Sequence, residues 1–222
     1  LSQELAKRGA TVLQFAVVEF LEPEHWTPLK RALSNLLSYE WVIFTSQNTV
    51  RFFFEAAHQQ RLTLPFGRRG PRVAAVGSET VRALAERGVA VDLRPEEFSS
   101  AALFESLRPH VPSKKVLLPQ SDRANPTLVE QLRQIGAQVD AVVAYRVVLP
   151  QAPDADLLRC IRSGQVDALA FASPSAVYNF AEIVGRTWLR KIRSQVCWAS
   201  IGPTTTKALR EHGVSAVEAE EA

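Results

Sequence analysis

Methionine is absent from the 222 residues, and cysteine occurs only at positions 160 and 197. No CxxC pair and no Cys/His cluster is present, so the sequence predicts no metal site. Cys197 lies in the apolar run Val196-Cys-Trp-Ala199 and is expected to be a buried small hydrophobe. With so few cysteines a reducing compartment is the default, and we expect a cytoplasmic protein.

No apolar run approaches the roughly 18 residues that a membrane-spanning helix needs, so no membrane partner is expected. The chain begins inside a predicted helix over 1–9 and stops where another helix would begin. We therefore expect natural ends beyond both termini, which leaves a targeting peptide open.

Neither sign of charge dominates: 26 Lys and Arg face 23 Asp and Glu, which gives a net charge of +3. Basic pairs such as Arg68-Arg69 and Lys114-Lys115 are short and scattered. This pattern is typical of a solvated surface rather than of a nucleic-acid interface, and no nucleic-acid partner is expected. A small anionic ligand fits the same balance.

The usual catalytic signatures are also missing. The chain has no GxSxG elbow, no HExxH motif, no Walker loop and no GxGxxG fingerprint, so no nucleotide or other cofactor is expected. The four histidines, at positions 25, 58, 110 and 212, lie in polar contexts and are expected at the surface. An enzyme of this sequence must work mainly by positioning its substrate and by backbone electrostatics.

Short β-branched runs alternate with amphipathic segments along the chain. Strands are predicted over 10–20, 41–45, 73–76, 116–118, 139–148, 168–171 and 196–201. Helices are predicted over 24–37, 48–60, 79–87, 126–135, 157–163, 175–184 and 204–212. This alternation predicts an α/β fold with parallel sheets and helices on both faces.

The sequence contains an internal repeat. Val42-Ile-Phe-Thr-Ser46 resembles Leu169-Ala-Phe-Ala-Ser173, and Ala75-Val-Gly-Ser78 resembles Ser200-Ile-Gly-Pro203. Both copies then continue to a Gly-Val pair, at 88–89 and at 213–214. Two motifs in the same order and at nearly the same separation predict two similar α/β domains.

Two proline-marked segments, 19–23 and 144–150, are the predicted crossovers between the domains. If both cross the same waist, one domain is discontinuous, residues 1–20 plus 150–222, and the other is continuous over 23–147. Two linkers side by side would act as a hinge, with the active-site cleft between the domains.

Each repeat places hydroxyl-bearing residues and a glycine between a strand and a helix. In open α/β sheets ligands bind outside the carboxyl ends of the strands, where helix N-termini offer free N–H groups and a partial positive charge. The same residues also suit plain helix capping, an alternative that the sequence leaves open. The predicted substrate-binding residues at these junctions are Thr45, Ser46, Gly77, Ser78, Thr80, Ser173, Ser175, Gly202, Pro203, Thr204 and Thr205.

Tyr145 is the titratable group of most interest because it lies in the second crossover segment. A phenol there can donate a proton to a leaving hydroxyl. Its ring could equally pack at the hinge, and the sequence does not decide between these roles. Tyr178 follows Ser175 on a predicted helix and is expected to pack.

The chain resembles uroporphyrinogen-III synthases in the order and spacing of several motifs along nearly its whole length. They are Lys7-Arg-Gly-Ala10, Phe44-Thr-Ser46, Val76-Gly-Ser78, Val143-Ala-Tyr-Arg146, Phe171-Ala-Ser-Pro-Ser175 and Ile201-Gly-Pro-Thr-Thr205. The resemblance implies two flavodoxin-like domains joined by a two-stranded linker, a monomer, and hydroxymethylbilane as the tetrapyrrole substrate. It implies loss of the terminal hydroxyl to give an azafulvene, followed by ring closure through a spiro-pyrrolenine that inverts ring D. It also makes Tyr145 the candidate acid, and it allows a transient hand-over from hydroxymethylbilane synthase.

Two departures from the family pattern matter. The family often carries an arginine in the loop after the strand that ends at Leu118, and here that loop reads Pro119-Gln-Ser-Asp-Arg-Ala-Asn125. Asn125 occupies the expected place of that arginine, and we predict Ser121 and Arg123 as substrate contacts. The family's opening strand, with its Thr-Arg pair, has no counterpart in this numbering.

Two other functions fit parts of the pattern. A two-domain protein that closes on a small anion would use the same hinge and helix ends without catalysis. An enzyme of the glycosyltransferase type would also have two Rossmann-like domains, but it ranks last because no sugar-nucleotide signature is present.

Overall fold

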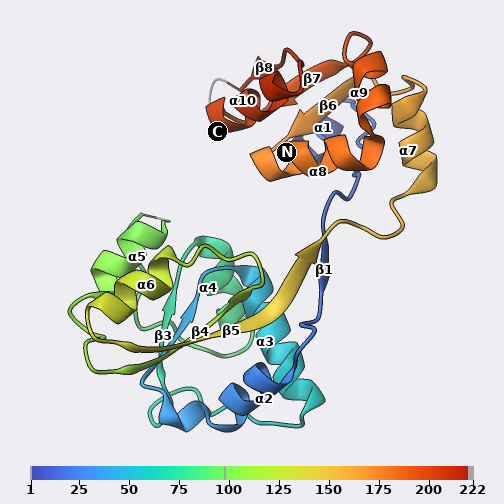
Figure 1. Cartoon of the computed structure of the whole chain (residues 1–222). Coiled ribbons are helices and arrows are strands. Elements are labelled where there is room, and N and C mark those ends of the chain that lie inside the picture. Colours follow the sequence, from blue (N-terminus) through green and yellow to red (C-terminus); the bar gives the residue numbers. More distant parts are fainter. Residues whose placement is uncertain (1, 98, 220–222) are drawn as a thin grey trace. The chain divides into compact units, whose positions relative to one another are not determined.

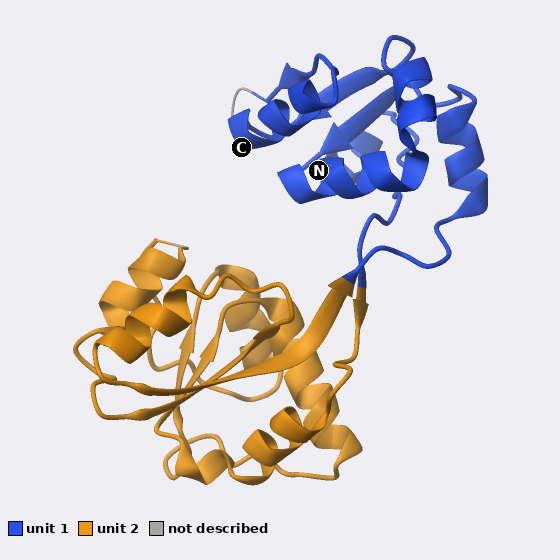
Figure 2. Ribbon diagram, viewed as in Figure 1, with its two compact units in different colours: residues 1–19, 148–222 blue, residues 20–147 orange. Residues whose placement is uncertain are grey.

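The structure is a computed structural model that describes residues 2–97 and 99–219. The chain divides into two compact units. Unit 1 is made of residues 1–19 and 148–222, and unit 2 of residues 20–147. Figure 2 shows that the chain enters unit 2 once and leaves it once, so unit 1 is the discontinuous one.

Strands and helices alternate as the sequence predicts (Figure 1). The strands are β1 (Glu19–Leu21), β2 (Trp41–Phe44), β3 (Arg72–Ala75), β4 (Lys115–Ser121), β5 (Gln138–Val148), β6 (Ala168–Phe171), β7 (Cys197–Ser200) and β8 (Val217–Glu218). The helices of the first part are α1 (Ser2–Lys7), α2 (Thr27–Ser34), the 3-10 turn η1 (Leu36–Ser38), α3 (Gln47–Gln59), α4 (Ser78–Ala85), α5 (Ser100–Leu107) and α6 (Thr127–Gln134). They are followed by α7 (Ala155–Arg162), α8 (Pro174–Val184), α9 (Arg186–Ile192) and α10 (Pro203–Glu211).

Unit 2 is built on a sheet with the order β1-β5-β4-β2-β3. The pairs β2–β3, β2–β4 and β4–β5 are parallel, and Leu93 adds a parallel bridge beside Ala74 of β3. Counted from β2 along the chain, the parallel strands and this bridge follow the order 3-2-1-4-5, whereas the flavodoxin order is 2-1-3-4-5. The order reverses between β2 and β4, and ligands of doubly wound sheets bind at such a switch point.

Helices cover both faces of the unit 2 sheet. Along β2 the side chains alternate between the faces: Val42 and Phe44 join the core formed with α2, α3 and α4. Trp41 and Ile43 join the core formed with α5 and α6. All four are nearly fully buried, as expected for a parallel strand covered on both sides. The predicted α/β class with helices on both faces is therefore confirmed.

Strand β5 carries an irregularity that reorients its second half. Gln120 of β4 pairs with Val143, but the next residue, Ser121, pairs with Tyr145, so Ala144 is skipped. Strict alternation would place Tyr145 on the face opposite Ala144. Because of the β-bulge, both residues pack into the core on the α3 side.

Unit 1 contains the parallel sheet β6-β7-β8. Its core includes Phe171, Phe180 and Trp198, whose rings stack or meet edge to face. The strand predicted over 10–20 was wrong for most of its length, because only Glu19–Leu21 forms ladder hydrogen bonds. Phe15 and Val17 still pack against this core. The apolar pattern over 10–20 therefore reflects burial of side chains and not pairing with a neighbouring strand.

The prediction for Cys197 was also wrong. Its side chain is exposed, while its neighbour Trp198 is 2% exposed. Successive residues of a strand point to opposite faces, and the apolar run hid the fact that one of these faces is open to solvent. Among the described residues, no helix is both long and apolar enough to cross a membrane.

The internal repeat is visible in equivalent hydrogen bonds of the two units. The N–H group of Val76 donates to Phe44 O at 3.1 Å in unit 2, and that of Ile201 donates to Phe171 O at 3.1 Å in unit 1. The helices that follow end alike, because Gly88 and Gly213 both adopt positive φ, at 71° and 72°. Each glycine forms the left-handed turn that commonly ends a helix.

Candidate active site

Ser46 lies at the carboxyl end of β2 and caps helix α3. Its φ and ψ are −156° and 153°, and its Oγ accepts the Thr49 N–H at 3.1 Å. Ser173 repeats this arrangement in unit 1, with φ and ψ of −159° and 154°, where its Oγ accepts the Ala176 N–H at 3.2 Å. Both serines therefore cap their helices, as the alternative interpretation predicted. A cap uses only part of the hydrogen-bonding capacity of each hydroxyl.

The structure brings Tyr145 to Ser46. The two side-chain oxygens are 3.4 Å apart across 99 positions of sequence. Ser46 follows β2 and Tyr145 lies on β5, with β4 between them, so both are at the carboxyl ends of parallel strands beside the switch point. Tyr145, the predicted acid, and Ser46, a predicted substrate contact, thus lie next to each other in unit 2.

The ring of Tyr145 is buried, with 7% of the residue exposed. It stacks on Phe52 at a centroid distance of 5.2 Å and an interplanar angle of 12°, and it meets Phe20 edge to face at 5.8 Å. The two roles considered for Tyr145 are therefore compatible, because the ring packs while the hydroxyl meets another polar group. Sequence reasoning missed Phe52, although its aromatic run on a predicted helix was a usable signal.

The second loop of unit 2 begins at Gly77, which precedes α4 with φ of 83°. Only glycine adopts this conformation without strain, so the residue is needed by the backbone itself. Ser78 is exposed at the start of the helix, whereas Thr80 is 3% exposed. The structure thus leaves Ser78 available to a ligand and places Thr80 in the packing beneath the loop. Thr45, beside Ser46, is half-buried.

The loop after β4 gives different roles to its polar residues. Asn125 Oδ1 accepts hydrogen bonds from the Thr127 N–H at 3.0 Å and from the Thr127 hydroxyl at 2.7 Å, so its side chain is bonded to the first residue of α6. Arg123 is exposed, and Ser121 is half-buried beside Tyr145 in the β4–β5 register. Arg123 is therefore the cation that this loop presents to solvent.

In unit 1 the loops after β6 and β7 lie next to each other, because these strands are parallel neighbours. The hydroxyls of Ser173 and Ser175 are hydrogen-bonded at 3.1 Å. Gly202 precedes α10 in an extended conformation, with φ of 178°. Pro203 and Thr204 are exposed, but Thr205 is 1% exposed and belongs to the interior.

A buried hydroxyl cluster supports this second loop, and sequence reasoning missed it. The hydroxyls of Ser200 and Thr206 are hydrogen-bonded at 2.7 Å. Thr206 also meets Gly202 O, at 3.1 Å, and the carboxylate of Glu218. These contacts tie the first turn of α10 to the carboxyl ends of β7 and β8. The Thr-Thr-Thr run was the only sequence signal for the cluster.

The prediction that the histidines lie at the surface is confirmed at three positions and wrong at one. His25, His58 and His110 are exposed. His212 is half-buried against Tyr178, with ring centroids 5.7 Å apart, and its buried Nε2 has no hydrogen-bond partner among the described residues. Tyr178 donates to Glu211 at 2.7 Å, and this hydrogen bond raises the pKa of its phenol. The prediction failed because the helix end that carries His212 packs beneath Tyr178.

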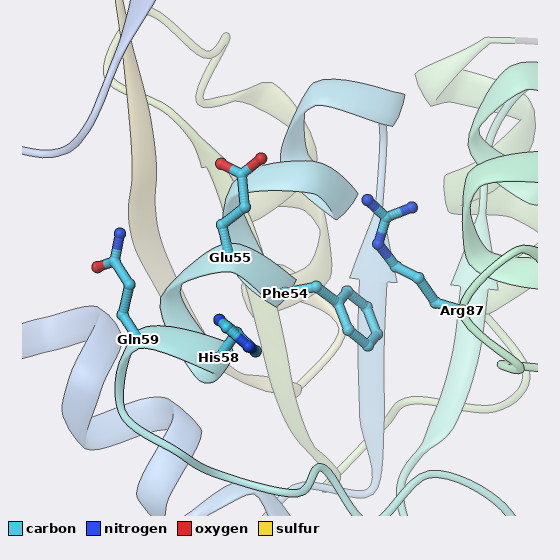
Figure 3. A pocket seen from close by; sticks show the side chains of 5 residues that line it. All are labelled: Phe54, Glu55, His58, Gln59 and Arg87. Atoms are coloured by element: carbon cyan, nitrogen blue, oxygen red, sulfur yellow. The ribbon is translucent and has the colours of Figure 1, made fainter.

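Two surface hollows lie away from the predicted site residues. The first, shown in Figure 3, is lined by Phe54, Glu55, His58, Gln59 and Arg87. Arg87 places its guanidinium over Phe54 and donates to Ala83 O at 2.8 Å, so this hollow marks the packing of α4 against α3. The second lies between α7 and α9, around Trp188. Within the described part of the chain, no group of three His, Cys, Asp or Glu side chains could hold a metal ion.

Fold and site together define a two-unit α/β protein whose loops offer hydroxyls and helix N-termini at the carboxyl edge of each parallel sheet. The chain belongs to the uroporphyrinogen-III synthase family, because the family model described as uroporphyrinogen-III synthase HemD matches residues 1–222. Members of this family are cyclising lyases of tetrapyrrole synthesis, and the chain is an enzyme of this class. The alternative of a non-catalytic anion-binding protein is not favoured.

Individual relatives agree with this assignment. The chain is 32% identical over 228 residues to the uroporphyrinogen-III synthase of Synechococcus elongatus, covering 98% of this chain and 84% of that protein. It resembles the crystal structure of a mutant uroporphyrinogen III synthase from Thermus thermophilus, with a TM-score of 0.58 and 25% identity over 99% of this chain and 87% of that one. It shares the fold of uroporphyrinogen-III synthetase from Helicobacter pylori, with a TM-score of 0.61 and 18% identity over 92% and 84% of the two chains.

Proposed function

We propose that the chain converts hydroxymethylbilane into uroporphyrinogen III, with loss of one water and inversion of ring D. The observation that carries the residue-level proposal is the meeting of Tyr145 and Ser46 at the switch point of the unit 2 sheet. Family membership supports the reaction, and this geometry supports a specific proton donor for its first step.

In the first step the Tyr145 phenol donates its proton to the terminal hydroxyl of the substrate. The carbon–oxygen bond breaks, the hydroxyl leaves as water, and the adjacent pyrrole nitrogen supplies the electron pair that forms the azafulvene and loses its own proton. The burial of the Tyr145 ring fixes where the proton is delivered.

In the later steps ring D attacks the azafulvene carbon through its own substituted carbon and forms a spiro-pyrrolenine. Fragmentation and re-closure then invert the ring, and a final proton loss restores the pyrrole. These steps exchange protons and carbon–carbon bonds within the substrate alone. We therefore expect turnover without a metal or a nucleotide.

We propose that the substrate carboxylates bind at the loops of both units. Support comes from the N-termini of α3, α4, α8 and α10, each of which follows a strand and offers backbone N–H groups with a partial positive charge. The exposed hydroxyls of Ser78, Ser175 and Thr204 add donors, and Arg123 adds a cation. Thr80 and Thr205 support these loops from beneath.

The setting of the enzyme is also part of the proposal. Cys160 and Cys197 are both free thiols, which supports a reducing compartment such as the cytoplasm. We propose a monomer that receives its unstable substrate by transient hand-over from hydroxymethylbilane synthase.

The test is to supply hydroxymethylbilane and separate the product isomers. Without enzyme the bilane closes to the symmetrical isomer I, so formation of isomer III reports catalysis. The expected result is isomer III at an unchanged rate after treatment with a chelator. Isomer I under all conditions would refute the proposed reaction, and loss of isomer III with the chelator alone would refute independence from metals.

A further inference from the structure

We propose that Ser46 is a positioning residue for the Tyr145 hydroxyl and acts through it rather than by binding substrate carboxylates alone. The inference rests on the proposed function and assigns a partner to its proton donor. It follows from three features of unit 2: the anchored Ser46 oxygen, the clamped Tyr145 ring, and the absence of this contact in the repeat copy that the structure describes in unit 1.

The oxygen of Ser46 is held from the helix side. It accepts the Thr49 N–H at 3.1 Å, and it is also hydrogen-bonded to the Thr49 hydroxyl at 2.9 Å. Thr49 is 1% exposed, so its own position is fixed by the packing of α3. Ser46 Oγ therefore stays in one place relative to the strand ends.

The ring of Tyr145 is held from the other side. Phe52 stacks on it and Phe20 meets it edge to face, so the ring has little freedom to turn. Phe52 and Thr49 lie three residues apart on α3 and therefore on the same side of that helix. One helix thus fixes both the phenol ring and the serine that faces its hydroxyl.

The oxygen–oxygen distance of 3.4 Å is long for a hydrogen bond between hydroxyls. Such a contact leaves the phenol proton available to a substrate. When Tyr145 donates this proton, its oxygen gains negative charge, and the Ser46 hydroxyl can turn to donate to it, while the Thr49 hydroxyl donates to Ser46. Hydrogen bonds to a charged oxygen are shorter and stronger than neutral ones, so this contact tightens as the leaving group departs.

The repeat separates this role from capping. Ser173 has almost the same dihedral angles as Ser46 and caps α8 in the same way, but the hydroxyl bonded to it is that of Ser175, at 3.1 Å. A capping serine at this junction does not by itself require a tyrosine. The contact with Tyr145 is a feature of unit 2, where the β5 bulge turns the phenol toward α3.

The experiment is a double-mutant cycle with Ser46→Ala, Tyr145→Phe and the combined variant, measured for kcat, KM and urea unfolding. We expect Ser46→Ala to lower kcat roughly three- to tenfold, the size of one hydrogen bond, with KM little changed. In the Tyr145→Phe background the same change should leave kcat unaltered, because the group that Ser46 positions is gone. Ser46→Thr keeps both the hydroxyl and the cap and should restore most of kcat.

Ser99→Ala is the matched control. Ser99 caps α5 in the same unit by accepting the Ala102 N–H at 3.1 Å, and it lies outside the proposed site. It should lower stability about as much as Ser46→Ala and leave kcat unchanged. Equal loss of kcat in both variants would mean that capping explains the effect of Ser46.

The stability arm does not depend on activity. Ser46→Ala and Tyr145→Phe should be non-additive in the free energy of unfolding, because each removes one partner of the same contact. Additive stabilities would refute the contact, and additive effects on kcat would refute the positioning role, even if the enzyme forms isomer III. If the wild-type protein forms no isomer III, the proposed reaction is refuted. Non-additive stabilities would in that case still support the contact between Ser46 and Tyr145, but no role of that contact in catalysis.

Discussion

Tyr145 and Ser46 meet at 3.4 Å although 99 positions separate them in the sequence. Parallel pairing of β2 with β4, and of β4 with β5, brings their strand ends to one edge of the sheet. The phenol therefore has a buried ring on the α3 face and a hydroxyl directed to a capped helix N-terminus. A proton donor in this environment can be held in a fixed position without any charged partner.

Tyr145→Phe should lower kcat by about tenfold or more, the lower part of the range for general acid catalysis. The substrate is intrinsically reactive, because its pyrrole nitrogen helps to expel the hydroxyl, so a larger effect is not expected. The ring still stacks on Phe52, and the melting temperature should change little. Steady-state formation of isomer III measures kcat. Tyr178→Phe is the control, since it removes the phenol oxygen bonded to Glu211 in unit 1 and should leave kcat unchanged.

Tyr145→Ala should behave differently because it removes a buried ring. Loss of a buried aromatic side chain typically costs about 3–5 kcal/mol of stability. Urea unfolding of the alanine and phenylalanine variants separates packing from chemistry. A phenylalanine variant with wild-type kcat would show that Tyr145 serves packing alone.

Gly202→Val should reduce activity while the protein stays folded. Gly202 has an extended φ of 178°, and a Cβ atom there would meet no atom within 4 Å, so the backbone and its surroundings accept a side chain. The added bulk would keep a carboxylate away from the N-terminus of α10. The expected result is a higher KM at an unchanged melting temperature. Wild-type KM in this variant would exclude the loop from substrate binding.

Gly77→Val is a poor test of binding, although the repeat makes Gly77 the counterpart of Gly202. Its φ of 83° is unfavourable for a β-branched residue, so valine should destabilise unit 2. We expect a lower melting temperature together with lower activity. Thermal unfolding of both valine variants checks this contrast, and equal stabilities would contradict it.

Arg123→Ala should raise KM with little change in kcat. Arg123 is exposed on the loop after β4, so its contribution should lie within the range of surface ion pairs, up to about fivefold in KM. Because salt screens exposed charges, the difference from wild type should shrink at high ionic strength. Arg108→Ala, which removes an exposed arginine paired with Glu105, is the control and should leave KM unchanged. A KM insensitive to Arg123 would remove this residue from the site.

Tyr39 should make stability depend on alkaline pH. Its hydroxyl donates to Asp140 Oδ2 at 2.7 Å, and burial, followed by this hydrogen bond, raises the pKa of the phenol well above its usual range. The folded state therefore holds the proton more tightly than the unfolded state does. This contribution is present below about pH 10 and is lost as pH rises beyond it.

The test compares urea unfolding of wild type and Tyr39→Phe between pH 7 and 11. Wild type should be more stable by about 1 kcal/mol at neutral pH, since Asp140 can be hydrated when the hydroxyl is removed. This advantage should fall above about pH 10. A difference that stays constant across the range would contradict the assigned hydrogen bond.

Local features were predictable from the sequence. A serine between an apolar strand and a helix predicts a cap, because capping needs only neighbouring N–H groups, and Ser46 and Ser173 both form one. Strand and helix alternation predicted the α/β class, because the apolar pattern of each element also depends on residues that are close in the sequence. The repeat predicted equivalent junctions, and the hydrogen bonds of Val76 and Ile201 confirm them.

Features that depend on distant neighbours were not predictable. Thr80 and Thr205 looked like ligand contacts, yet both are buried because the first turn of each helix packs one side against its unit. Cys197 looked buried because its neighbours are apolar, but the sheet leaves its side chain exposed. Phe52 was not singled out, since its importance comes from a tyrosine on another strand.

The bulge at Ala144 separates the length of β5 from the direction in which Tyr145 points. β5 has one residue more than β4 at this place, and the bulge absorbs it, so Tyr145 stays on the α3 side. Deleting Ala144 would remove the bulge and put Tyr145 directly after Val143, where strict alternation again points the phenol toward α3. A regular strand that keeps Ala144 would instead turn the phenol to the opposite face. One residue inserted into β4 before Ser121 would favour that regular pairing, so this insertion should harm activity far more than deletion or replacement of Ala144.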